Sequence, residues 1–240
     1  MSQQTVRRRP VNNANLEARR KAMRRKKIKE KKFMLLGMLL AVILVIVLIV
    51  WGIVSLVKSG FADTSTLTIA KDGTITMDEV EDFKESNYDE SELEEDTETL
   101  ADEYNESGMG GKAKFKKAKV KDGVAYLRME YSDYNAYVGF TGNELFVGTV
   151  GEAKLKGYDF NDTFSSVSNK TKGDAISSED MMADDSKKVV MIRGNVHVIV
   201  PGKVTAVSDS CTSIINDNEI SITQPDGNKD ATVLTIIMYE

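Results

Sequence analysis

Residues 33–57 read FMLLGMLLAVILVIVLIVWGIVSLV, a run of 25 residues without a charge, of which 18 are Leu, Ile, Val or Phe. As an α-helix rising about 1.5 Å per residue, the run is roughly 37 Å long, enough to cross a hydrocarbon core of about 30 Å with some tilt. Its interior has no ionisable residue and no Gly-x-x-x-Gly motif, so nothing in it indicates a conduction path or a close-packed helix dimer. We expect a single membrane-spanning helix from Phe33 to Val57, with Trp51 near its outer end.

A cleaved signal peptide is the competing interpretation of this run. Its apolar core would be about 7–15 residues long and would be followed by small residues at a cleavage site. The run is much longer than that, although Ser59-Gly60-Phe61-Ala62-Asp63 leaves cleavage open. A lipoprotein anchor would need a cysteine directly after the run, and the only cysteine is Cys211. We therefore expect an uncleaved signal anchor.

Residues 1–32 form a basic tail with 13 Lys and Arg against two acids, a net charge of +11. Because an excess of cations stays on the cytoplasmic side, we expect a cytoplasmic tail and an extracellular C-terminal region. The tail is predicted to be disordered and can contact anionic lipid of the inner leaflet. In the simpler interpretation its charges only set topology. The cations expected at the headgroups are Arg24, Arg25, Lys26, Lys27, Lys31 and Lys32.

Residues 58–240 are acidic, with 19 Lys and Arg against 35 Asp and Glu, a net charge of −16. An acidic domain repels phosphate, which argues against nucleic acid as its partner. After a tether over 58–65, the pattern predicts a mainly antiparallel α+β region with one or two helices. We divide it into an α+β part over 66–167, a loop or linker over 168–188, and a small antiparallel β part over 189–240.

Two hairpins are predicted at repeated Lys-Asp-Gly sequences. Lys71-Asp72-Gly73 separates two β-type runs, and Lys121-Asp122-Gly123 separates another two. An Asp-Gly pair supplies the positive φ that a tight turn between antiparallel strands needs. Further strands are expected at 145–150, 160–167, 189–192, 196–200, 204–207, 220–223 and 233–239.

One long helix is predicted between the hairpins, from Asp89 to Glu106, where ten of 18 residues are acidic. Asp89 is its expected N-cap, Glu92 completes a capping box, and Tyr88 with Leu93 forms a hydrophobic staple. Short helical segments are also expected around 133–138 and 152–156. The long helix should bury one stripe made of Leu93, Thr97, Leu100 and Tyr104.

Short motifs fall into three blocks. The first is 71–75 with 80–83 and Tyr104-Asn105; the second is 120–125 with 145–149 and 157–160; the third is 200–204 with 207–209. Together they resemble a group of uncharacterised surface lipoproteins and membrane-anchored proteins of Gram-positive bacteria, over most of 66–210. The chain departs from the lipoprotein members in having a membrane helix in place of a lipid-bearing cysteine. The resemblance implies a location at the cell surface and no particular activity.

No catalytic or cofactor motif is present. His197 is the only histidine; in a strand it would share a face with Ile199, opposite Val196, Val198 and Val200. Cys211 and His197 lack the sequence context and the following arginine of a sortase-like transpeptidase. No His/Cys cluster, calcium loop or phosphate-binding loop occurs, so we predict no metal and no cofactor.

These patterns predict a non-catalytic interaction or scaffold domain of the cell envelope, held by one membrane helix, whose partner is an envelope protein or polymer. Two alternatives stay open. The protein could be a transmembrane sensor or regulator acting through the basic tail, or an envelope hydrolase using two carboxylates in a cleft.

Overall fold

The computed structural model describes residues 60–82, 90–108, 110–224 and 233–240, and Phe61–Glu240 forms one compact unit. The predicted membrane span, with Phe33, Trp51 and Val57, lies outside the described residues, as do the predicted lipid contacts. Within the described ranges, no helix combines the length and apolar character that a bilayer crossing requires. The lipid contacts in question are Arg24, Arg25, Lys26, Lys27, Lys31 and Lys32.

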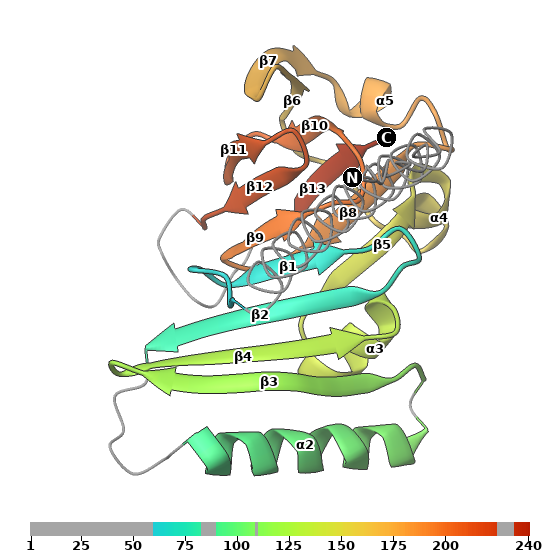
Figure 1. Cartoon of the computed structure of the whole chain (residues 1–240). Helices are drawn as coiled ribbons and strands as arrows, with labels where there is room; N and C mark the ends of the chain where they lie inside the picture. The colour runs from blue at the N-terminus through green and yellow to red at the C-terminus, as the bar shows by residue number, and fades with distance from the viewer. Residues whose placement is uncertain (1–59, 83–89, 109, 225–232) are drawn as a thin grey trace, which may run out of the picture. The chain divides into compact units, whose positions relative to one another are not determined.

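The unit is α+β and is built on two mainly antiparallel sheets (Figure 1). The seven-stranded sheet has the order β11-β12-β9-β1-β2-β4-β3, and β1 with β9 is its one parallel pair among the described strands. The six-stranded sheet has the order β5-β8-β13-β10-β6-β7. The first sheet comprises β1 (Thr66–Ile69), β2 (Ile75–Asp82), β3 (Ala113–Lys121), β4 (Val124–Tyr131), β9 (Val196–Ile199), β11 (Thr212–Asn216) and β12 (Glu219–Ile222). The second comprises β5 (Leu145–Thr149), β6 (Phe164–Ser168), β7 (Thr171–Ile176), β8 (Lys188–Ile192), β10 (Val204–Ser208) and β13 (Thr235–Tyr239).

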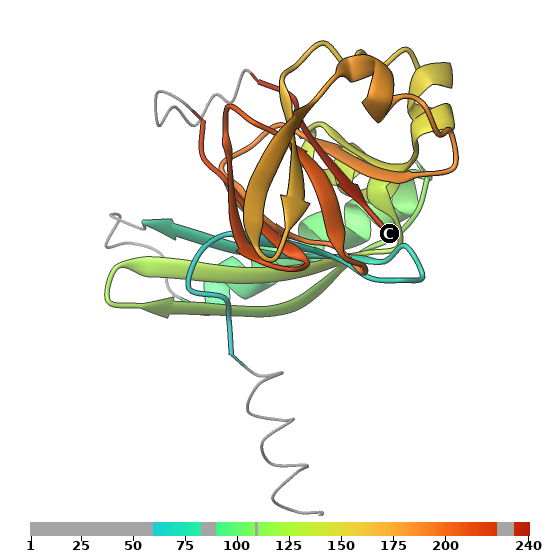
Figure 2. The same ribbon diagram turned by 90° about the horizontal axis from the view of Figure 1, so that it is seen from above.

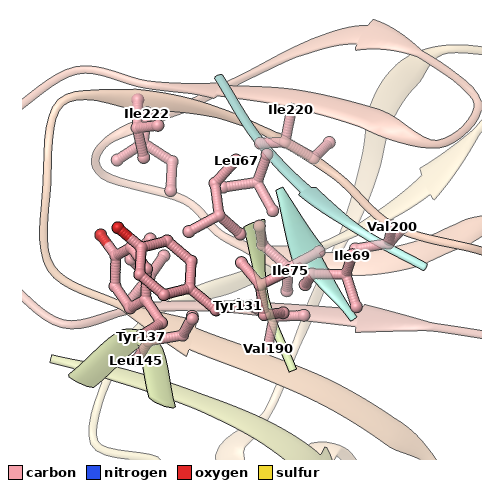
Figure 3. Close-up of a cluster of buried hydrophobic side chains, with 14 of the residues drawn as sticks. Leu67, Ile69, Ile75, Tyr131, Tyr137, Leu145, Val190, Val200, Ile220 and Ile222 are labelled. Carbon is pink, nitrogen blue, oxygen red and sulfur yellow. The ribbon is translucent and has the colours of Figure 1, made fainter. Parts of the chain in front are cut away.

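The two sheets share a hydrophobic core. Seen from above, β2, β3 and β4 of the seven-stranded sheet, coloured teal to yellow-green, lie along one side of the unit (Figure 2). Leu67 and Ile75 of the first sheet and Val190 of the second are fully buried in one cluster (Figure 3). Each such side chain stabilises the fold by about 1.5–3 kcal/mol on burial. The same cluster includes Ile69, Tyr131, Tyr137, Leu145, Val200, Ile220 and Ile222.

The inner strands of the six-stranded sheet, such as β8 and β13, are buried on both faces. In β8, Val190 and Ile192 face the core between the sheets, whereas Val189 and Met191 belong to a second cluster on the other face. Strand alternation therefore makes every apolar residue of this continuous run buried. Two short helices, α4 (Val150–Leu155) and α5 (Ser178–Met181), contribute to the second cluster.

The C-terminal strands do not form a sheet of their own. The predicted small antiparallel part over 189–240 is divided: β8, β10 and β13 join the six-stranded sheet, whereas β9, β11 and β12 join the seven-stranded sheet. Local patterns identify strands but do not identify their partners, because pairing depends on contacts between segments far apart in the chain.

Both predicted hairpins are confirmed. β1 pairs with β2 through a turn in which Gly73 has φ +90°, and β3 pairs with β4 through Asp122 (φ 52°) and Gly123 (φ 77°). The consecutive positive φ values of the second turn fit the right-handed twist of the strands that it joins.

The long helix is confirmed as α2 (Glu90–Ser107), which ends at Gly108. Its predicted cap and staple, Asp89 and Tyr88, lie outside the described residues. The predicted buried stripe is wrong at Leu100, which is 56% exposed, because Ala101 occupies the buried position one residue later. The buried residues are Thr97, Ala101 and Tyr104.

Helix α2 covers the edge of the seven-stranded sheet along β3 (Figure 1). The Asn105 side chain accepts from the Ala113 backbone N–H (2.9 Å) and donates to the Ala113 carbonyl (2.8 Å). Near the other end of the strand, the Val120 N–H donates to the Glu90 carboxylate (3.2 Å). These side chains satisfy edge groups that would otherwise be available to another strand.

The loop expected over 168–188 is wrong, because this segment contains β7 and α5. β7 is an exposed edge strand with few large apolar side chains, so it lacks the alternation by which strands are recognised. Ser177 caps α5 by accepting from the Asp180 N–H (3.0 Å). β11 also lay outside the predicted strands.

The two predicted short helices are confirmed. α3 (Tyr134–Thr141) is capped by Asp133, whose carboxylate accepts from the Asn135 and Ala136 N–H groups. α4 has a capping box formed by Thr149 and Glu152. Accepting the Thr149 backbone N–H lowers the pKa of Glu152 below its ordinary value.

Candidate functional site

The candidate site is the outer face of the seven-stranded sheet, the face that points away from the six-stranded sheet. Cross-strand register places one residue from every strand in a row across this face. Because residues directly opposite one another project to the same side, the row is a continuous polar band. It consists of Ser213, Ser221, His197, Thr66, Asp78, Arg128 and Lys117.

An ion pair occupies the middle of this band. The Arg128 guanidinium donates from Nε to Oδ1 of Asp78 (2.5 Å) and from Nη2 to Oδ2 (2.7 Å). The two side chains are only 20% and 12% exposed, and the hydrogen bonds from Arg128 to Asp78 raise the pKa of the guanidinium above its ordinary value. The bidentate geometry fixes both side chains against the sheet.

Phe61 lies over this ion pair where the chain enters the unit. Its ring centroid is 5.4 Å from that of Tyr126, 4.5 Å from Nζ of Lys117 and 5.6 Å from Cζ of Arg128. At these distances the Phe61 ring makes cation–π interactions with both cations, which stabilise its position on the sheet. The segment that leads into β1 is therefore anchored on the outer face.

Strand β3 gives one part of this face a strong positive charge. Its sequence, AKFKKAKVK, alternates apolar and lysine residues except at Lys116-Lys117. The register shifts between Phe115 and Lys117, which marks a β-bulge that accommodates the extra residue. Without the bulge the alternation would reverse and turn later lysines toward the core. The lysines held on the outer face are Lys114, Lys116, Lys117, Lys119 and Lys121.

We call the outer surface of β2, β4 and β3 the lysine face. Besides the five lysines and Arg128 it carries three acids, Asp78, Asp82 and Glu130, by the alternation of their strands. Glu130 pairs with Lys116 (3.1 Å). The lysine face is therefore net positive within a region whose net charge is −16.

His197 lies in a small hollow at the start of β9. Its side chain is on the face predicted from sequence, and Nδ1 is 3.3 Å from Oε1 of Glu219. Ser221 is its cross-strand neighbour, yet no hydrogen bond between these two side chains occurs in the described part of the chain. Histidine and carboxylate thus lack the nucleophile contact of a catalytic triad. The hollow, about 310 Å³, is lined by Asp63, Thr64, Ser65, Val80, Asn195, Val196, His197, Ser221, Ile222 and Thr223.

A larger groove of about 710 Å³ lies beside the β1–β2 turn. Its charged lining mixes cations and carboxylates, and the Glu152 carboxylate there is engaged by the Thr149 N–H (2.7 Å). No group of three His, Cys, Asp or Glu suited to a metal occurs among the described residues. Cys211 is buried and forms no disulfide within the described part of the chain. The charged residues lining the groove are Lys71, Asp72, Glu152, Lys188 and Glu240.

Sequence reasoning placed His197 correctly on its strand face but missed the lysine face. The available signal was the lysine alternation of β3 with one doubled position, which indicates a one-sided charged strand interrupted by a bulge. The pairing of Arg128 with Asp78, 50 residues earlier, has no local signal.

The chain matches no protein-family model, and neither a curated protein nor a solved structure matches it.

Proposed function

We propose that this chain is a single-pass membrane protein of the cell envelope whose unit Phe61–Glu240 is a non-catalytic interaction domain on the outer side of the membrane. The observation that carries the proposal is the charge division of the sequence. A tail of net charge +11 and a region of net charge −16 flank 25 uncharged residues. Cations retain the tail in the cytoplasm, and long domains translocate regardless of their charge.

The non-catalytic part of the proposal is supported by the kind of surface available. The outer face of the seven-stranded sheet presents a broad polar band and a lysine face, and the His197 side chain in that band contacts the Glu219 carboxylate. A sheet face of this kind is suited to an extended partner surface more than to a small substrate enclosed in a pocket.

Protease treatment of intact spheroplasts expressing the chain with a C-terminal epitope tests the topology. We expect loss of the epitope from the treated spheroplasts and retention of the tail in the membrane fraction after alkaline extraction. Protection of the epitope while a known surface protein is digested would overturn the proposal. As a control, Arg24, Arg25, Lys26 and Lys27 are replaced by Glu, which should reduce the fraction of epitope outside.

A further inference from the structure

The segment that leads into the unit packs on the lysine face. Phe61 packs against Tyr126, Lys117 and Arg128, so the first described residues lie on this face. In the sequence, only Lys58, Ser59 and Gly60 separate Phe61 from the end of the predicted span. Four residue steps reach at most about 14 Å, which keeps Phe61 close to the membrane in which the span lies.

The chemistry of the face fits an anionic lipid surface. Lys114, Lys119 and Lys121 are exposed on β3, and half-buried Phe61 and Tyr126 lie on the same face. Long cationic side chains reach phosphate headgroups while their aliphatic stems stay against the protein, and aromatic rings suit the interfacial layer.

Helix α2 sets the limit of this surface. It carries nine acidic residues, but its buried Ala101 and Tyr104 belong to the cluster between the sheets, so it packs on the core side of β3. Its charges oppose attraction at long range. Attraction to anionic headgroups is therefore confined to short distance, where the lysines are nearer than the acids.

We propose that the lysine face, carried by Lys114, Lys116, Lys117, Lys119 and Lys121, docks on anionic phospholipid headgroups of the outer leaflet. The inference rests on the proposed function, because it requires the span that brings Phe61 to the membrane. Docking would hold the unit with one defined side toward the bilayer and leave its other surfaces toward the envelope partner.

Lysine acylation of the full chain in lipid nanodiscs tests the docking. Discs of phosphatidylcholine are compared with discs that also contain phosphatidylglycerol, and acylation rates are read for each lysine by mass spectrometry. We expect rates at Lys114, Lys119 and Lys121 to fall at least threefold in the anionic discs, while exposed Lys170 and Lys203 keep their rates. High salt should remove the difference, because the distance over which charges interact, the Debye length, shortens to about 3 Å at 1 M salt.

A matched pair of variants separates docking from general charge. K114Q with K119Q should restore the Lys121 rate in anionic discs toward its value in neutral discs, whereas K170Q with K203Q should leave the protection intact. Replacing Glu103 and Glu106 of α2 by Gln should increase the protection, since it removes opposing charge.

Three results would overturn the inference. Equal rates at the face and control lysines, in chains that remain in anionic discs, would exclude docking while leaving the proposed function standing. A chain that fails to stay in either kind of disc would remove both. Protection by a soluble glycerol-phosphate polymer in neutral discs, without protection by phosphatidylglycerol, would assign the face to a wall polymer.

Discussion

Arg128 and Arg193 make the same kind of contact, a guanidinium against a carboxylate, at two depths. The Arg128–Asp78 side chains are 20% and 12% exposed, whereas the Arg193–Glu144 side chains are 37% and 38% exposed. Removing one partner of a pair shielded from water leaves the other charge without compensation, whereas water replaces the partner of an exposed pair.

We expect Arg128→Ala to lower the free energy of unfolding by about 2–3 kcal/mol and Arg193→Ala by less than about 1 kcal/mol. Denaturant titration of the full chain in detergent micelles measures both. The double change of Arg128 and Asp78 to Ala should recover part of the loss, because no unpaired charge remains. Equal losses for the two arginines would show that burial does not govern these pairs.

Burial of Tyr131 makes the free energy of unfolding depend on pH in the alkaline range. It is 2% exposed and its ring packs edge-on against Tyr137 at 5.3 Å, and burial raises the pKa of its phenol above the ordinary value. In the unfolded chain a tyrosine ionises near pH 10. Because the folded state keeps the phenol protonated, the contribution of Tyr131 to the free energy of unfolding is complete below about pH 10. This contribution is lost as the pH rises further.

Tyr131→Phe should therefore change the free energy of unfolding by less than about 1 kcal/mol at pH 7 and reduce its decline above pH 10. Comparison of denaturant midpoints at pH 7 and above pH 10 measures the difference. Lysines also titrate there, so the quantity of interest is the gap between variant and wild type. Parallel declines of the two proteins would contradict this account.

At the scale of the element, α2 acts as the edge protection of β3 through Asn105. Asn105→Ala removes two hydrogen bonds to the Ala113 backbone, at a cost of about 1–3 kcal/mol, and should speed hydrogen exchange at the Ala113 amide. Glu103→Ala, an exposed change in the same helix, should stay within about 0.5 kcal/mol and leave that amide protected. Unchanged exchange at Ala113 in the Asn105 variant would assign the edge protection to other contacts.

The elements differ in how far sequence predicts them, for physical reasons. Turns and caps depend on nearby residues, so Asp122-Gly123 and the Asp133 cap were predictable. Strand β7 depends on pairing with β6, and the buried position of Ala101 depends on how α2 is rotated against β3 and α3. Likewise Arg128 and Asp78 meet only because β2 and β4 pair, which no local pattern specifies.

At the scale of the whole molecule, β13 holds the six-stranded sheet together. It lies between β8 and β10, and all five of its residues are buried. A chain lacking residues 235–240 leaves two neighbouring strands without a shared partner, and we expect it not to fold. Limited proteolysis should show a stable core in the full chain and none in the shortened one. A hydrophilic tag after Glu240 is the control, and a protease-resistant truncated chain would contradict the role given to β13.

The central place of β13 also has a consequence for biosynthesis. At about 5–20 residues per second, this strand leaves the ribosome roughly 10–30 s after β1. Throughout that interval β8 and β10 have no common neighbour, and β1 lacks β9 for most of it. The nascent polypeptide therefore cannot reach its native fold before β13 has been synthesised. Until then it stays unfolded, which is the state that a secretion channel for unfolded substrates requires.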